Sequence, residues 1–154
     1  QKLEAGRLKV EVKNQLEQNG IVVTDDSYLE KVITLIKDRC TLLPDFYTQA
    51  SFFFEAPRAF DVEAVKAKWN EDKKKFFIEW QSRLSGLDNW DTLTIEESFK
   101  NLATEKNIKP GELQLPFRIM LVGGKFGPAV FQIAAFIGKA ATISRIATAT
   151  EIFG

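Results

Sequence analysis

The stretch "LPFRIMLVGGKFGPAVFQIAAFIGK", Leu115–Lys139, decides the fold, because glycine and proline divide a long apolar run into two parts. Gly123-Gly124 should end one helix, and Gly127-Pro128 should start the next, with Pro128 in its first turn and Gly138 at its end. Before its terminal Lys139 the run holds two cations, Arg118 and Lys125, but no acid, Ser, Thr or Asn. Its breaks come too early for the roughly 18–20 uninterrupted apolar residues of a membrane helix. We therefore expect two core helices joined at a tight corner.

Helical periodicity continues through most of the 154 residues. Apolar residues recur at i, i+3, i+4 and i+7, for example Leu29, Val32, Ile33 and Ile36, and no β-hairpin or βαβ alternation is visible. We expect an all-α chain of two small helical-bundle subdomains. Pro57 and a fresh N-cap at Asp61 divide the chain into residues 1–60 and 61–154.

Short polar side chains predict where several helices begin. Ser27 and Thr94 each precede a Glu by three residues, which is the capping-box spacing. Asp61 and Asn70 are further N-cap candidates, and Asn70 would separate two helices. The lysines at 73–75 are more typical of a solvated helix face, with phosphate contact as the alternative.

Composition excludes several kinds of site. The chain has a single cysteine, Cys40, and no His, so neither an internal disulfide framework nor a Cys/His metal site is expected. The commonest general base is absent, and no Walker-type phosphate loop occurs, so we predict no catalytic residue. The chain begins at Gln1 without a signal peptide. We expect a fragment, internal or C-terminal, of a longer cytoplasmic protein.

Charge is balanced overall but unevenly distributed. The formal net charge is zero, yet residues 113–150 contain no acid and four cations, Arg118, Lys125, Lys139 and Arg145. Such a local excess of one sign attracts a polyanion. At the corner, the unpaired N–H groups of a helix start beside Lys125 favour a phosphate or the polar edge of a base. The alternative is an ordinary helix–loop–helix corner, in which Phe126 fills the core instead of stacking on a base.

At these residues the sequence is similar to a known family. "KPGELQLPFRIMLVGGKFGPAVFQIAAFIGKAATISRI" closely resembles the C-terminal anticodon-binding region of bacterial glutamyl-tRNA synthetases. Upstream, "LIKDRCTLLPDF" resembles the family's helix turn with Arg39, Thr41 and Leu42, and "ASFFFEAPRAFD" resembles the segment that joins its two helical subdomains. The matches in the first segment are Gly111, Pro116, Phe117, Arg118, Leu121, Val122, Gly123, Gly127, Pro128, Ala129, Val130, Phe131, Ile137, Gly138 and Lys139.

The resemblance implies recognition of the anticodon arm of tRNA(Glu). In the family, an Arg at the position of Arg39 contacts an anticodon base and helps to separate glutamate from glutamine tRNAs. The implied anticodon-binding residues are Arg39, Arg118, Lys125, Gly127, Pro128, Ala129, Val130 and Phe131. The chain departs from the family at Gly127, where Ser or Thr is usual, so a side-chain hydroxyl contact is replaced at best by a backbone N–H. Phe117 and Val122 replace the usual Leu and Thr.

The resemblance also implies what lies elsewhere. The family's "HIGH"-like and "KMSKS"-like motifs do not occur in this chain. Catalysis, ATP and Mg²⁺ are therefore expected in a catalytic domain of the same protein, with no cofactor or metal in these residues. The expected partners are tRNA(Glu) and that catalytic domain, in a cytoplasmic monomer without membrane contact. The alternative function is a helical protein–protein interaction module, which the zero net charge and the Phe-rich helices favour.

Overall fold

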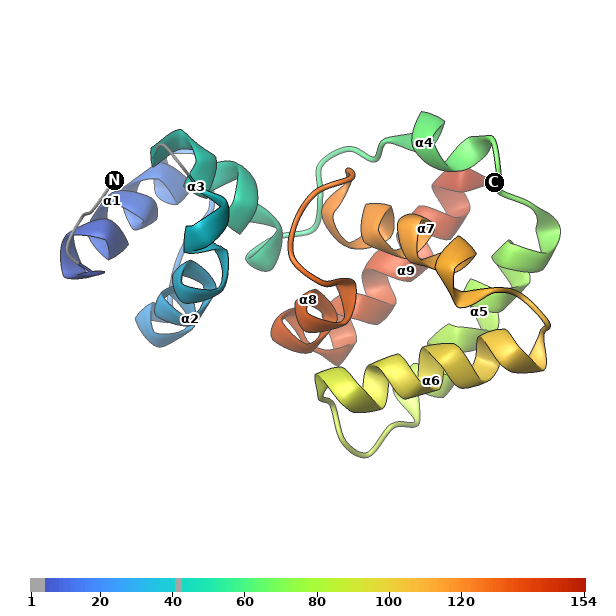
Figure 1. The fold of residues 1–154 in the computed structure, drawn as a ribbon. Helices are drawn as coiled ribbons and strands as arrows, with labels where there is room; N and C mark the ends of the chain where they lie inside the picture. Colours follow the sequence, from blue (N-terminus) through green and yellow to red (C-terminus); the bar gives the residue numbers. More distant parts are fainter. Residues whose placement is uncertain (1–4, 41–42) are drawn as a thin grey trace. The chain divides into compact units, whose positions relative to one another are not determined.

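The chain is helical throughout the part that the structure, a computed structural model, describes, residues 5–40 and 43–154. No β-strand occurs in those residues, which confirms the predicted all-α class (Figure 1). Two 3₁₀ turns, η1 (Lys37–Arg39) and η2 (Ser51–Phe53), follow α2 and α3. The α-helices are α1 (Ala5–Gln18), α2 (Asp26–Ile36), α3 (Leu43–Ala50), α4 (Val62–Lys66), α5 (Glu71–Ser85), α6 (Thr92–Glu105), α7 (Pro110–Val122), α8 (Val130–Ile137) and α9 (Lys139–Phe153).

The chain separates into two compact units, Gln1–Glu55 and Ala56–Gly154. The sequence placed the division after residue 60, five residues later than the end of the first unit. The intervening residues belong to the second unit, and two of them, Pro57 and Ala59, lie close to Gly123 at the end of α7. The backbone N–H of Asp61 donates to the carbonyl oxygen of Gly123 at 2.8 Å.

In the first unit, α1, α2 and α3 surround a small core. The N-cap of α2 is Asp25, whose carboxylate accepts the Tyr28 N–H at 3.1 Å. The prediction of a cap at Ser27 was wrong. The last extended residue before the helix is Asp25, and Ser27 already lies inside the first turn. The Tyr28 hydroxyl donates to the Phe53 carbonyl oxygen at 2.9 Å, which ties α2 to η2. The buried residues include Val12, Leu16, Leu29, Val32, Ile36, Phe46, Ala50 and Phe53.

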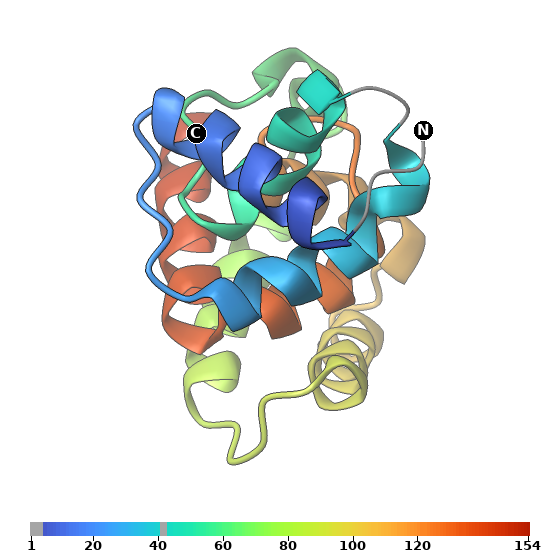
Figure 2. The same ribbon diagram turned by 90° about the vertical axis from the view of Figure 1, so that its left-hand side faces the viewer.

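The core of the second unit is an aromatic cluster centred on Trp80 of α5. The Trp80 ring lies 4.9 Å from Phe117 of α7 and 5.1 Å from Phe99 of α6, and all three side chains are fully buried. Phe131 of α8 joins the cluster 5.1 Å from Phe99. On its other side α5 packs against α9 (Figures 1 and 2). The helices before and after the corner are thus anchored in one core.

Acids and amides cap the helices of the second unit. Asp61 and Asn70 each accept the backbone N–H three residues later, at 3.3 and 2.9 Å, which confirms both predicted caps. At α6 the cap is Asp91, which accepts the Thr94 N–H at 2.8 Å. The prediction of Thr94 as a cap was therefore wrong. The backbone of Asp91, three residues before Thr94, is extended, so the helix begins directly after Asp91.

The expectation that lysines 73–75 form a solvated helix face is wrong at Lys73. Its side chain is buried, and its Nζ donates to the Lys68 carbonyl oxygen at 2.8 Å. The ammonium therefore holds the turn between α4 and α5 together, while Lys75 is exposed.

No single helix within the described ranges has the length and apolarity to cross a membrane. Helices α8 and α9 have the required length and apolarity only when taken together, and the chain bends by 118° between them. The bend lies at Gly138, which ends α8 with a φ of 94° as the sequence predicted.

We expect acid to weaken the second unit partly through Asp91. Hydrogen bonds from Thr94, its backbone N–H first, hold the pKa of this carboxyl below its usual range. Such a group stabilises the fold above its unfolded-state pKa, and the contribution is lost as pH falls through the lower folded-state pKa. Asp91→Asn keeps a capping oxygen but does not titrate, so it should lose less stability than the parent on acidification.

The measurement is urea unfolding followed by Trp fluorescence at about pH 6 and about pH 2. It reports on the second unit alone, because Trp69, Trp80 and Trp90 all lie there. Asp88→Asn, at an exposed acid in the same loop, is the matched control. Equal losses in the parent and in Asp91→Asn would contradict the assignment.

Candidate nucleic-acid interface

The corner, residues 123–129 between α7 and α8, follows a path that requires glycine. Gly123 ends α7 in the left-handed region with a φ of 89°, as predicted, and Gly127 has a φ of 102°. A Cβ at Gly123 would lie 2.5 Å from the Ala59 carbonyl oxygen and 2.9 Å from the Pro57 Cβ. Both the backbone conformation and the neighbouring chain therefore exclude a side chain at this position.

The ring of Phe126 folds back over the corner itself. A Cβ at Gly124 would lie 2.6 Å from Cε2 of this ring, so the ring rests on the Gly124 backbone. Phe126 is half-buried there. Its packing explains why the corner carries a second glycine.

Arg118 reaches from α7 into the corner. Its Nη1 donates to the carbonyl oxygens of Phe126, Gly127 and Pro128 at 3.0, 3.0 and 2.7 Å. The side chain is half-buried. One guanidinium nitrogen thus gathers three successive carbonyl groups, and hydrogen bonds from a charged donor are stronger than neutral ones.

Helix α8 begins later than the sequence predicted. Pro128 was expected in its first turn, but the N-cap is Ala129 and the first helical residue is Val130. The difference follows from the backbone, since Gly127 is left-handed and Ala129 is extended with a ψ of 135°. No side chain caps the N–H groups of the first turn. These donors, with the positive end of the helix dipole, are suited to an anionic or acceptor-rich ligand.

Burial decides which parts of the predicted site residues are accessible. Lys125 and Ala129 are exposed and Gly127 is partly exposed, whereas the side chains of Pro128, Val130 and Phe131 are buried. Phe131 is 6% exposed and packs on Phe99, so its ring is committed to the core. The buried three therefore contribute only backbone to any ligand.

The cations of the acid-free stretch 113–150 act mainly on backbone carbonyl groups. Besides Arg118, the Lys139 Nζ donates to the Leu87 carbonyl oxygen at 2.5 Å, and the buried Arg145 donates from Nη1 to that of Leu121 at 2.8 Å. These acceptors lie just beyond the C-terminus of α5 and at that of α7. Lys125 differs from the other three because it is exposed.

The far end of α8 is held by residues that the sequence did not indicate. The Trp90 indole Nε1 donates to the Ala134 carbonyl oxygen at 3.0 Å, and the buried Thr142 hydroxyl donates to that of Gly138 at 2.8 Å. Trp90 lies in the loop before α6, 44 residues away from its acceptor. No local spacing signals such a contact.

Arg39 belongs to the first unit. It is the last residue of η1, is exposed, and precedes the extended Cys40. The 3₁₀ turn therefore presents a guanidinium to solvent at the end of α2. The neighbouring motif positions Thr41 and Leu42 lie outside the described residues.

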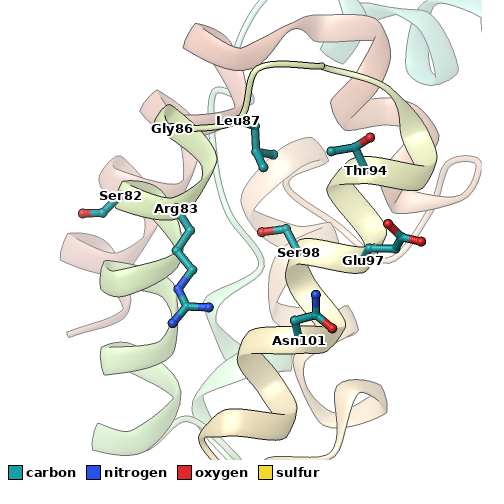
Figure 3. A pocket seen from close by; sticks show the side chains of 8 residues that line it. All are labelled: Ser82, Arg83, Gly86, Leu87, Thr94, Glu97, Ser98 and Asn101. Atoms are coloured by element: carbon teal, nitrogen blue, oxygen red, sulfur yellow. The ribbon is translucent and has the colours of Figure 1, made fainter.

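A shallow hollow of about 430 Å³ lies elsewhere in the second unit, between α5 and α6 (Figure 3). Two of its polar side chains, Arg83 and Ser98, already have partners. Arg83 donates to Glu105 at 2.7 and 2.8 Å, and the Ser98 hydroxyl accepts from the Trp80 indole at 3.0 Å. The hollow is lined by Ser82, Arg83, Gly86, Leu87, Thr94, Glu97, Ser98 and Asn101. The internal ion pair leaves the corner and Arg39 as the stronger candidates.

Metal-ligating clusters and the Cys40 thiol complete the description of reactive side chains. Within residues 5–40 and 43–154, no cluster of His, Cys, Asp and Glu is arranged to hold a metal ion. Burial, and then the charge of Asp45, raise the pKa of the Cys40 thiol to about 11. The thiol is therefore almost entirely protonated near neutral pH, when it is a poor nucleophile.

The family model of the anticodon binding domain matches this chain over residues 7–150. The chain is 37% identical over 141 residues to a glutamate–tRNA ligase of Christiangramia forsetii, which covers 92% of this chain and 28% of the relative. It is 35% identical over 129 residues to that of Chloroherpeton thalassium, covering 84% of this chain and 26% of the relative. The chain thus spans under a third of the length of these curated relatives.

Solved structures give the same result. A crystal structure of a glutamate tRNA ligase from Elizabethkingia meningosepticum, in complex with its amino acid, matches with a TM-score of 0.85 and 35% identity. The match covers 99% of this chain and 30% of that one. A glutamate-tRNA synthetase from Elizabethkingia anophelis matches with a TM-score of 0.72 and 33% identity, covering 97% and 29%.

Two glycine substitutions should have opposite effects on stability. Gly123→Ala forces a left-handed backbone on alanine and a clash with the Ala59 carbonyl oxygen, so we expect a loss of about 2 kcal/mol or more. Gly111→Ala, in α7 with open space around it, should stabilise by about 0.5–1 kcal/mol. Urea unfolding followed by Trp fluorescence measures both, and a Gly123→Ala variant as stable as the parent would refute the close approach.

Cys40 should react slowly until the first unit unfolds. With a folded pKa of about 11 and an ordinary value of 9.0, unfolding raises the thiolate fraction near pH 8 about a hundredfold. Reaction with a disulfide reagent, timed with and without urea, measures the ratio. A folded rate equal to the unfolded one would show that burial does not protect the thiol.

Proposed function

Because this chain belongs to the anticodon binding domain family, we propose that it recognises the anticodon arm of tRNA(Glu) as the C-terminal part of a glutamate–tRNA ligase. The observation that carries the proposal is the corner. It offers uncapped backbone donors at the start of α8 beside an exposed cation, Lys125, within the residues that the family match covers.

The corner suits an unstacked RNA loop better than a duplex. Single-stranded bases expose hydrogen-bond acceptors on their edges, and backbone N–H groups at a helix start pair with such acceptors. The Lys125 ammonium supplies the charge that the neighbouring phosphates attract. The backbone surface of this interface is formed by Gly127, Pro128, Ala129, Val130 and Phe131. Arg118 holds this backbone from the side of α7, where it donates to the Gly127 carbonyl oxygen.

Arg39 serves as a separate reader on the first unit. A guanidinium presents a planar fork of donors, which distinguishes the edge of one base from another. Arg39 is exposed at the end of η1, and its position matches the family residue that separates glutamate from glutamine tRNAs. We therefore assign to it the discrimination between the two tRNAs.

The parent protein is proposed to charge tRNA(Glu) with glutamate in an ATP-dependent reaction. This assignment rests on the relatives, of whose length the chain spans 28% and 26%. ATP and Mg²⁺ would bind in a catalytic domain of the same protein, and the residues of this chain would take no cofactor and perform no catalysis. The parent would act as a cytoplasmic monomer.

Binding of the chain to a tRNA(Glu) transcript tests the proposal. The dissociation constant is measured against salt, for this tRNA and for one with a substituted anticodon. Affinity should fall steeply with salt, and Lys125→Gln should reduce the slope of log K against log salt by about 0.7, as expected for one phosphate contact on a single strand. Lys139→Gln, which removes a cation outside the corner, should leave the slope near that of the parent. Equal affinity of the unsubstituted chain for both tRNAs would contradict anticodon recognition.

The role of Arg39 has its own test. Arg39→Lys keeps the charge but removes the planar fork, so discrimination between glutamate and glutamine anticodons should fall roughly tenfold. Arg7→Lys, at an exposed arginine on α1, is the matched control. Discrimination that is unchanged in Arg39→Lys would remove Arg39 from the specificity site.

A further inference from the structure

The three carbonyl groups held by Arg118 fix the direction of the neighbouring N–H groups. In a trans peptide the carbonyl and the following N–H point in opposite directions. Because the carbonyls of Phe126 and Pro128 face Nη1, the N–H groups of Gly127 and Ala129 face away from it. Pro128, between them, has no N–H. In the part of the chain that the structure describes, no protein acceptor takes these two donors.

The corner needs such a brace because its sequence is otherwise permissive. Gly123, Gly124 and Gly127 give the backbone many accessible conformations, each of which an isolated loop would sample. Arg118 is itself fixed, since its neighbours Phe117 and Ile119 are fully buried in the core. Its guanidinium therefore transmits the position of α7 to residues 126–128.

We propose that Arg118 is a positioning residue of the anticodon interface: it holds three carbonyls and so turns the N–H groups of Gly127 and Ala129 toward the bound RNA loop. The inference rests on the function proposed above and adds a division of labour to it. Lys125 meets the phosphate, the corner N–H groups meet acceptor atoms of the bases, and Arg118 acts through the corner.

Two variants separate this role from a direct RNA contact. Arg118→Gln removes the charge and the reach of the guanidinium. Arg118→Lys keeps the charge, but its ammonium is one bond shorter than the path to Nη1, so it should not hold all three carbonyls. Lys139→Gln is the control for loss of a cation elsewhere in the unit. Trp fluorescence establishes whether each variant is folded. If Arg118→Gln does not fold, the test is made with Arg118→Lys alone.

The first readout is amide hydrogen exchange of Ile133 and the α8 residues after it in the RNA-free protein, because the Ile133 N–H is the first in this helix with an acceptor, the Ala129 carbonyl oxygen. Both Arg118 variants should exchange there about tenfold faster or more, with the aromatic core unchanged, whereas Lys139→Gln should match the parent. Unchanged exchange in both Arg118 variants would overturn the proposal. Because no RNA is present, this readout separates failure of the brace from failure of tRNA recognition.

The second readout is the affinity for the tRNA(Glu) transcript and its salt dependence. Both variants should bind roughly tenfold more weakly with an unchanged salt slope, because preorganisation is lost and a phosphate contact is not. A slope reduced in Arg118→Gln but restored in Arg118→Lys would overturn the proposal in favour of a phosphate contact. A relaxed base preference with unchanged amide exchange would overturn it in favour of direct base reading.

Discussion

The packing of Trp80 against Phe99 and Phe117 is the contact on which the geometry of the second unit depends. It joins α5, α6 and α7 through rings 4.9 and 5.1 Å apart, and Phe131 ties α8 to the same cluster. Each such ring pair adds about 0.5–1.5 kcal/mol to the free energy of burial. Because the helices on both sides of the corner enter one core, the seven residues between them must follow a short path. The left-handed glycines make that path accessible.

Several basic side chains in this chain stabilise the fold by donating hydrogen bonds to backbone carbonyl groups, a role that their number in the sequence does not reveal. Arg118, Lys139 and Arg145 each donate to carbonyl oxygens at helix ends or in the corner. A carbonyl at a helix C-terminus lacks an intrahelical partner and lies at the negative end of the helix dipole, which favours a cation. The charge of the acid-free stretch suggests a surface for a polyanion, but three of its four cations hold backbone carbonyl groups. Lys125 is the exposed one of the four.

The sequence predicted those features that depend on local chemistry. Helical periodicity, the caps at Asp61 and Asn70, and the helix ends at Gly123 and Gly138 each follow from a few neighbouring residues. Errors arose where two residues compete for one task, as when Asp25 and Asp91 cap helices assigned to Ser27 and Thr94.

The sequence predicted where the corner between α7 and α8 lies but not how the corner is built. Residues 123–129 were identified as a corner with backbone donors. The direction of the Arg118 side chain and the long-range contact from Trp90 to Ala134 depend on tertiary packing, and neither has a signature in spacing. The burial of Phe131 follows likewise from the aromatic cluster, so this aromatic residue beside the corner serves the core.

Gly127 has a consequence for how this corner can change during evolution. The family that the sequence resembles usually carries Ser or Thr there, but in this chain φ is 102°, a conformation that residues with a side chain rarely adopt. A single substitution to the family residue would therefore strain the backbone before its hydroxyl could help. The hydroxyl-bearing corner and the glycine corner are separate local solutions, and passage between them requires coordinated changes at neighbouring positions. Exchanging the corner between relatives would thus succeed as a block more readily than residue by residue.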